Sequence, residues 1–397
     1  MGNITFTLGE GGLGRVLPGE DHISGIIFQN ASLPAGFGSS DRIKRVTSLA
    51  EAVALGITFA LFPPEYYHVS EFFRANPKGI LYIGIYAITT DAFDGSEIVL
   101  VQNYAQGKIR QMGVFLIDTF AVADLTDCDT KADVCAAANK PLSVLLAADF
   151  TATTVSSLIG GTLPRSLTAQ RASVVLGEDL GGVGGALAVS EGYSITTLGH
   201  TLGTLSAAKV HENIGWIGKF NASDGTENET VGFATGELIS TQTEATLTSL
   251  TDGGFIFLRN VVGKSGSFYN DAPTAVVATS DYAYIENQRT IDKAIRGVYA
   301  AVLDLVNSPL YVDADTGKLS ESTIAVFRNT ALVPLESMAA NGEISAKADG
   351  ELPDTTVTID PDQNVLSTST ITMTIRLVPV GVARTIAINI GFSVNVN

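Results

Sequence analysis

The chain has 397 residues, which is enough for two or three domains. Apolar residues make up 45% of it and charged residues 16%, below the roughly 25% of an average soluble protein, so we expect much surface to be buried inside domains or between subunits. The net charge of −17 argues against general nucleic-acid binding, because phosphates need a basic face.

The sequence lacks the patterns that direct a chain into a membrane. Its first residues show no basic region followed by an apolar core, so we expect no signal peptide. No apolar run approaches the roughly 20 residues of a membrane helix, so we expect no direct membrane insertion. The two cysteines, Cys128 and Cys135, have no neighbouring histidine cluster, which argues against a zinc site and fits a reducing compartment.

Residues 1–21 form a glycine-rich stretch with one short alternating piece. Its apolar positions are Ile4, Phe6 and Leu8. We interpret the stretch as an N-terminal arm.

Residues 22–220 alternate between apolar strand patterns and short helical patterns. The predicted strands are 22–28, 43–46, 80–88, 112–117, 142–147 and 172–176, and the predicted helices are 48–56, 63–76, 96–106 and 130–139. A capping box, Ser48 with Glu51, opens the first helix, and Pro63-Pro64 opens the second. The alternation predicts an α/β domain with a doubly wound, mostly parallel sheet.

Residues 221–235 are rich in Gly, Ser, Asn and Asp near their start, which is typical of a linker or exposed loop. After them, residues 236–384 indicate an α+β domain. We expect strands at 254–262 and 275–279, and helices at 282–307 and 321–340, the latter bent at Pro334.

The end of the chain alternates apolar and polar residues in two runs, 371–377 and 386–396, with turn chemistry at Pro379 and Gly381 between them. Residues 385–397 therefore predict an extended strand whose apolar face carries Ile386, Ile388, Ile390, Phe392, Val394 and Val396. Such a strand needs a partner. It is either the last strand of the chain's own sheet or a strand given to a neighbouring subunit.

No motif in the sequence predicts catalysis or a cofactor. Gly181–Gly185 follows a predicted strand but lacks the spacing of a dinucleotide loop, and Gly263-Lys264-Ser265 lacks the first glycine of a P-loop. The four histidines do not pair at metal-ligand spacing. We therefore expect neither an enzyme nor a bound cofactor or metal.

The helix at 282–307 is strongly amphipathic. One face carries the apolar residues Ile291, Ile295, Val298, Val302 and Leu305. Nearly opposite lies a basic stripe formed by Arg289, Lys293 and Arg296. On an isolated helix such a stripe is a solvated face, but in so acidic a chain it could meet an acidic partner.

Five segments point to one protein family. They are residues 281–296, the helix around 331–335, the strand at 378–384, and the N-terminal stretches 16–25 and 71–82. These segments resemble contractile tail sheath proteins, most closely those of Mu-like phages and prophages. The resemblance covers most of the chain and rests on diffuse patterns without an invariant catalytic motif.

The resemblance implies a virion tail protein, assembled in the host bacterial cytoplasm, that polymerises with itself into a helical cylinder around the tail tube and contracts. It implies partners in the tube, baseplate and tail terminator proteins. Carried onto this chain, it implies that Arg289, Lys293 and Arg296 face the tube and that Ile4–Leu8 and Thr385–Val396 are exchanged between subunits. The first alternative is a Rossmann-like enzyme with a C-terminal oligomerisation domain. A third interpretation is another phage structural protein, such as a baseplate or tube component, although a tube protein would ordinarily be much smaller and mainly β.

Overall fold

The computed structural model describes residues 19–87, 93–313, 318–345 and 355–391. The chain forms two compact units, Met1–Val306 and Asn307–Asn397. None of the described helices is both long enough and apolar enough to cross a membrane.

The first unit is built on a seven-stranded sheet with the order β10-β7-β5-β4-β1-β3-β2. Neighbouring strands are parallel except β2 and β3. The strands are β1 Ile23–Gln29, β2 Ile43–Val46, β3 Ile80–Tyr86, β4 Gln111–Thr119, β5 Ser143–Asp149, β7 Ala172–Val175 and β10 Phe255–Ile256. This parallel-rich α/β sheet agrees with the predicted fold class.

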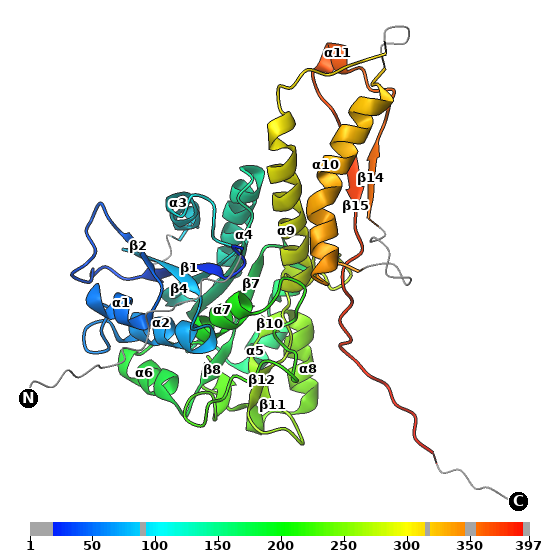
Figure 1. The fold of residues 1–397 in the computed structure, drawn as a ribbon. Coiled ribbons are helices and arrows are strands. Elements are labelled where there is room, and N and C mark those ends of the chain that lie inside the picture. The colour runs from blue at the N-terminus through cyan, green and yellow to red at the C-terminus, as the bar shows by residue number, and fades with distance from the viewer. Residues whose placement is uncertain (1–18, 88–92, 314–317, 346–354, 392–397) are drawn as a thin grey trace, which may run out of the picture. The chain divides into compact units, whose positions relative to one another are not determined.

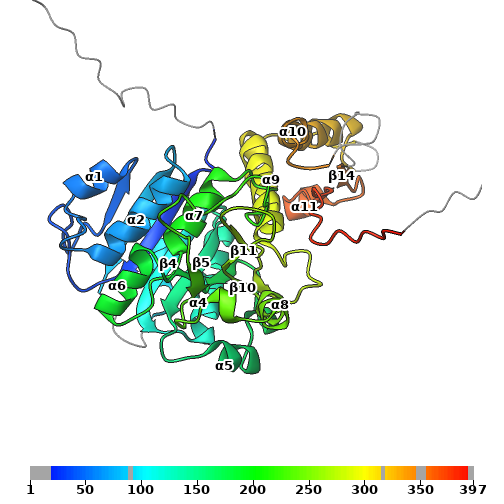
Figure 2. The same cartoon turned by 90° about the horizontal axis from the view of Figure 1, so that it is seen from below.

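Helices cover both faces of this sheet, with α3 and α4 on one side and α1, α2 and α7 on the other (Figures 1 and 2). The helices of the unit are α1 Leu49–Ala54, α2 Pro63–Ala75, α3 Ser96–Tyr104, α4 Val122–Ala137, α5 Val155–Gly160, α6 Val183–Glu191, α7 Leu198–Ala207, α8 Glu244–Gly253 and α9 Ile285–Val302. Because both faces are covered, the central strands are mostly apolar, and β1 and β5 are buried at every position.

Three antiparallel pairs of short strands complete the unit. They are β6 Thr168–Ala169 with β13 Ala275–Val276, β8 Gly177–Asp179 with β9 Val231–Phe233, and β11 Leu258–Asn260 with β12 Ser267–Tyr269. Single 3₁₀ turns lie at η1 Pro164–Ser166, η2 Ile239–Thr241 and η3 Leu303–Leu305.

The second unit pairs one long helix with a small sheet. α10 Glu321–Ala340 contains Pro334, as expected, and packs against the antiparallel strands β14 Thr356–Ile359 and β15 Met373–Arg376; a short helix, α11 Val365–Thr368, lies between the strands in sequence. Its small core consists of Leu319, Ile324, Ile359 and Val365.

Local signals located several element ends correctly. The Ser48 hydroxyl accepts a hydrogen bond from the Glu51 amide at 3.3 Å, and Gly56 follows α1 with a φ of +93°. The Glu51 carboxylate accepts from the amide of Thr47 at 2.6 Å instead of returning to Ser48. α2 begins at Pro63 as predicted.

The division of the chain differs from the prediction. Residues 221–235 lie inside the first unit, because β9 pairs with β8 and the later β10 completes the seven-stranded sheet. α9 also belongs to the first unit, although it was expected in a separate α+β domain.

The predicted C-terminal hairpin is also corrected. Residues 373–376 do form a strand, and its partner among the described residues is β14, which precedes it in the chain; residues 386–391 form no strand. Val357 and Ile359 of β14 are buried, and Ile359 belongs to the small core against which Met373 of β15 packs.

Candidate functional site

α9 turns its charged side inward and leaves apolar side chains exposed. Its buried residues are Ile285, Glu286, Gln288, Arg289, Thr290, Asp292 and Ala294. Ile295 and Tyr299 are 44% and 40% exposed. This arrangement is the reverse of a usual surface helix, whose apolar stripe faces the core.

A buried ion pair attaches α9 to the sheet domain. Nη1 of Arg171, which directly precedes β7, donates to both carboxylate oxygens of Asp292, at 3.0 and 2.8 Å. Gln288 donates to the same carboxylate at 3.0 Å, and Arg171 Nε donates to Asp133 of α4 at 2.9 Å. Burial raises the pKa of Asp292, although Arg171 opposes that effect. Buried charges persist only when partners of this kind satisfy them.

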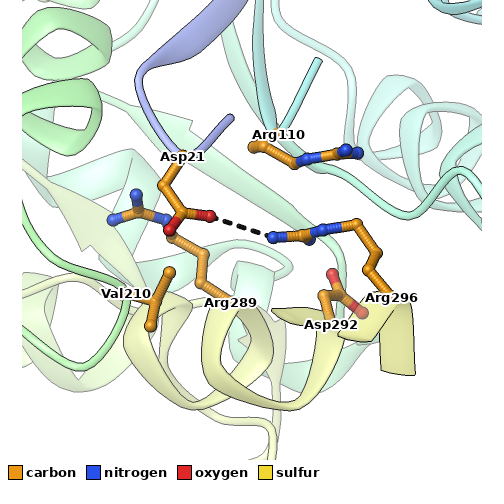
Figure 3. Close-up of a pocket in the computed structure, with 6 residues that line it drawn as sticks. All are labelled: Asp21, Arg110, Val210, Arg289, Asp292 and Arg296. Carbon is orange, nitrogen blue, oxygen red and sulfur yellow. Dashed lines mark hydrogen bonds and ion pairs between the residues drawn. The ribbon is translucent and has the colours of Figure 1, made fainter. Parts of the chain in front are cut away.

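A second charged cluster joins α9 to the segment that leads into β1 (Figure 3). Asp21 accepts from Lys293 Nζ at 2.6 Å and from an Arg296 guanidinium nitrogen at 3.0 Å. Burial would raise the pKa of Asp21, but the charges of Lys293 and Arg296 outweigh it and hold the pKa below its usual value. Next to Asp21, Glu20 forms an ion pair with Arg110.

The cluster brings several cations close together. Arg110, Arg289 and Arg296 line the same small pocket as Asp21, Val210 and Asp292 (Figure 3). Burial and the nearby charge of Arg110 lower the pKa of Arg296 to about 10. The arrangement therefore holds α9 in place through charges from distant parts of the chain.

The structure places all three residues of the predicted basic stripe at this cluster. Arg289 is 3% exposed and donates to the carbonyl oxygen of Ala208 at 3.2 Å. Lys293 and Arg296 pair with Asp21. The stripe is thus engaged within the chain instead of forming a solvated face. Its predicted contact with a tail tube is not tested by a single chain and stays a prediction.

The C-terminal segment, in contrast to α9, is exposed and makes few contacts with the rest of the described chain. Ser345 binds the chain at Val378 and Pro379, and from 380 onward the described residues form no strand. Ile386, Ile388 and Ile390 are 77%, 72% and 92% exposed. The other predicted exchange residues, Ile4, Phe6, Leu8, Phe392, Val394 and Val396, lie outside the described residues.

The predicted glycine cluster opens α6 without forming a phosphate site. Asp179 accepts from the amide of Gly182 at 3.1 Å, and Glu227 accepts from the amide of Val183 at 3.2 Å. Two carboxylates therefore occupy the helix N-terminus, where a nucleotide phosphate would bind. This observation argues against the dinucleotide-enzyme alternative.

Two of the histidines, His68 and His200, are buried in the protein core. Burial lowers the pKa of each to about 3. His200 Nδ1 lies 2.7 Å from the Tyr269 hydroxyl. Within the described part of the chain, no group of three or more His, Cys, Asp or Glu side chains is arranged to hold a metal ion.

Sequence reasoning missed the residues that receive the charges of α9. Asp21 and Arg171 pair with side chains of α9 but lie far from it in sequence, and neither stands in a recognisable motif. Asp292 does carry a local signal, because it lies four residues after Gln288 and between Arg289 and Arg296 on the same helix.

Two family models together match nearly the whole chain. One is described as DUF2586, N-terminal domain, and matches residues 1–273. The other is described as DUF2586, C-terminal domain, and matches residues 281–397. No curated protein matches the sequence.

The fold is similar to that of two solved structures. A chain of the anti-feeding prophage baseplate has a TM-score of 0.64 and 12% identity, with 99% of each chain covered. A sheath tail protein from Listeria innocua has a TM-score of 0.54 and 10% identity, over 92% of this chain and 96% of that one. The resemblance to tail sheath proteins is therefore confirmed at the level of the fold, while the narrower resemblance to Mu-like phages is not tested.

Proposed function

The chain belongs to the DUF2586 family, and we propose that it is a structural subunit of a contractile tail sheath. In this role it polymerises into a helical cylinder around a tail tube and contracts to drive the tube through the target envelope. The observation that carries the proposal is the similarity of fold to a sheath tail protein and to a baseplate chain over nearly their full lengths.

The exposed C-terminal segment supports a link between subunits. Three isoleucines at alternate positions, Ile386, Ile388 and Ile390, share one side of an extended chain and are largely exposed. Exposed apolar strands are normally covered, because they otherwise aggregate. We propose that the segment is added to a sheet in a neighbouring subunit.

The β14–β15 sheet is the acceptor that the structure favours. It has only two strands among the described residues, so each strand offers one edge that no described strand pairs. Two-stranded sheets are marginal, and a third strand stabilises them. A link of this kind would survive sliding between subunits, because many backbone hydrogen bonds would have to break at once.

α9 remains the element proposed to contact the tube. The contact predicted from the sequence uses Arg289, Lys293 and Arg296. The structure offers a second side, on which Ile295 and Tyr299 are exposed. Because the three cations are engaged within the chain, we favour the apolar side.

The same proposal gives the partners and the place of action. The chain would assemble with itself, with the tube, and with baseplate and tail terminator proteins, in a virion tail built in the bacterial cytoplasm. Neither nucleotide hydrolysis nor a cofactor is required if the contracted lattice buries more surface between subunits than the extended one.

Removing residues 385–397 tests the proposal. We expect the truncated chain to stay folded, because the described residues of this segment are exposed, and to form no cylinders. Circular dichroism checks folding, and sedimentation with electron microscopy checks assembly. Truncated chains that assemble like the full chain would refute strand exchange, and full-length chains that never assemble, even with a tube protein, would refute the sheath role.

A further inference from the structure

An open pocket of about 360 Å³ lies between α2 and α6, at a distance in sequence from every assembly element discussed above. The two helices are neighbours in the first unit (Figure 1). The lining residues are Phe59, Tyr66, Tyr67, Ser70, Glu71, Arg74, Val183 and Glu227. The pocket therefore combines aromatic walls with charged groups.

The aromatic wall is partly open to solvent. Phe59 is 48% exposed and meets Tyr66 edge to face, with ring centroids 5.8 Å apart. Val183, at the start of α6, is 37% exposed. Tyr67 is buried, and its hydroxyl has no hydrogen-bond partner among the residues that the structure describes. A buried phenol of this kind is costly unless something binds it.

The acidic side of the pocket carries more negative charge than the chain neutralises. A Cβ on Gly182 would lie 2.1 Å from Asp179 Oδ2 and 2.6 Å from Glu227 Oε2, so both carboxylates converge on this glycine. The amides of Gly181, Gly182 and Asn228 donate to Asp179, and the amide of Val183 donates to Glu227. The two carboxyl side chains also share a hydrogen bond. Among the described residues, no Lys, Arg or His forms an ion pair with either carboxylate.

Arg74 is the one cation among the described residues that line the pocket, and it already pairs with carboxylates. Arg74 donates to both carboxylate oxygens of Glu71, at 2.8 and 2.5 Å, and to the Ala222 carbonyl at 2.9 Å. Asp224 lies 3.6 Å away on its other side. Burial and the charges of Glu71 and Asp179 raise the pKa of Glu227 to about 7. Burial, the largest cause, disfavours the charged form of the Glu227 carboxyl, and the neighbouring carboxylates add to this effect.

We propose that this pocket binds the guanidinium or ammonium group of a basic side chain presented by another protein chain. The cation would lie between Glu227 and the hydroxyl of Tyr67, with its apolar stem along Phe59 and Tyr66. Aromatic faces attract cations, and carboxylates give guanidinium its strongest hydrogen bonds. A protein side chain suits the site because two of the lining residues, Phe59 and Val183, are apolar and exposed.

Blocked amino acids provide direct probes. We would titrate the full chain with N-acetyl-arginine methylamide, with its uncharged isostere, N-acetyl-citrulline methylamide, and with free arginine. Saturation-transfer NMR signals would report the binding of each. This readout works for single subunits and for assemblies. We expect saturable transfer to the arginine probe and affinity about tenfold lower for the citrulline probe, because one charge-assisted hydrogen bond is lost.

Three variants decide whether the binding occurs at this pocket. Glu227→Gln removes the charge and should weaken the arginine probe about tenfold, and Phe59→Ala should weaken it without disturbing the cap of α6. Glu244→Gln, at an exposed position in α8, serves as the matched control and should have no effect. Melting curves show whether each variant is folded.

Four results would overturn the proposal. They are no transfer to the arginine probe, equal binding of the citrulline probe, binding that neither Glu227→Gln nor Phe59→Ala weakens, and tighter binding of free arginine than of the blocked probe. The last would mean that the ligand is a free amino acid. Cation binding here does not depend on the tail role proposed above, so either can fail alone.

Discussion

Asp21 connects two parts of the first unit that are far apart in sequence. Its carboxylate accepts from Lys293 and Arg296, whose positions on α9 are separated by nearly one helical turn. We expect Asp21→Asn to lower the free energy of unfolding by about 1–3 kcal/mol at neutral pH, because partly buried cations lose their counter-charge. Denaturant unfolding of the two proteins measures the difference.

The pH dependence of this effect has a definite sign. The pKa of Asp21 is lowered in the folded chain, so its contribution is fully present above the unfolded pKa of about 3.9 and is lost as the pH falls through the folded value. The exposed Asp281→Asn is the control and should change little. A difference that persists undiminished at pH 2 would show that the ion pairs are not the cause.

Glu227 predicts the opposite trend. Its pKa is raised to about 7, so the folded chain holds this proton more tightly than the unfolded chain does. The free energy of unfolding should therefore fall as the pH rises from about 4.3 to about 7. We expect Glu227→Gln to remove that part of the slope. An unchanged slope in thermal melts across this range would contradict the assignment.

At the scale of the element, α9 depends on its buried pair with the sheet domain. Asp292→Asn leaves Arg171 buried beside an uncharged side chain, and we expect a loss of about 3–5 kcal/mol. Replacing both partners with apolar residues, Arg171→Met with Asp292→Leu, should cost less than the single change. Equal or additive losses in urea unfolding would show that the two charges do not act as a pair.

The exposed side of α9 gives a prediction about partners. We expect Ile295→Ser to change stability by less than about 0.5 kcal/mol, because the side chain is 44% exposed. It should nevertheless reduce co-sedimentation with a tail tube protein. Lys293→Gln is the comparison; if it alone reduces tube binding, the contact lies on the basic stripe, as the sequence predicted.

The elements of this fold differ in how far sequence predicts them. Apolar runs and caps located β2, α1 and α2 within a residue or so, because their signals are local. α4 begins at Val122, eight positions before the predicted start, since its acidic first half hides the helical period. For α9 the period separated the two faces correctly but could not say which is buried, because Asp21 and Arg171 lie far away in sequence. The sequence likewise could not predict that β15 pairs with β14, because the pairing joins residues that are more than ten positions apart.

At the scale of the whole molecule, the two compact units contain different functional features. The first unit, Met1–Val306, is a covered α/β sheet that holds α9 and the cation pocket. The second, Asn307–Asn397, is small, has a core of few residues and ends in an exposed apolar segment. Because its hydrophobic core is small, we expect the second unit to be stabilised strongly by a strand that a neighbouring subunit adds to its sheet.

The most direct test of the central claim is an electron cryo-microscopy map of the assembled full-length chain. We predict helical cylinders in which residues 386–390 of one subunit form a strand beside β14 or β15 of its neighbour. Cylinders in which this segment folds back on its own chain would contradict strand exchange. A chain that stays monomeric at high concentration, with tube protein present, would contradict the sheath role itself.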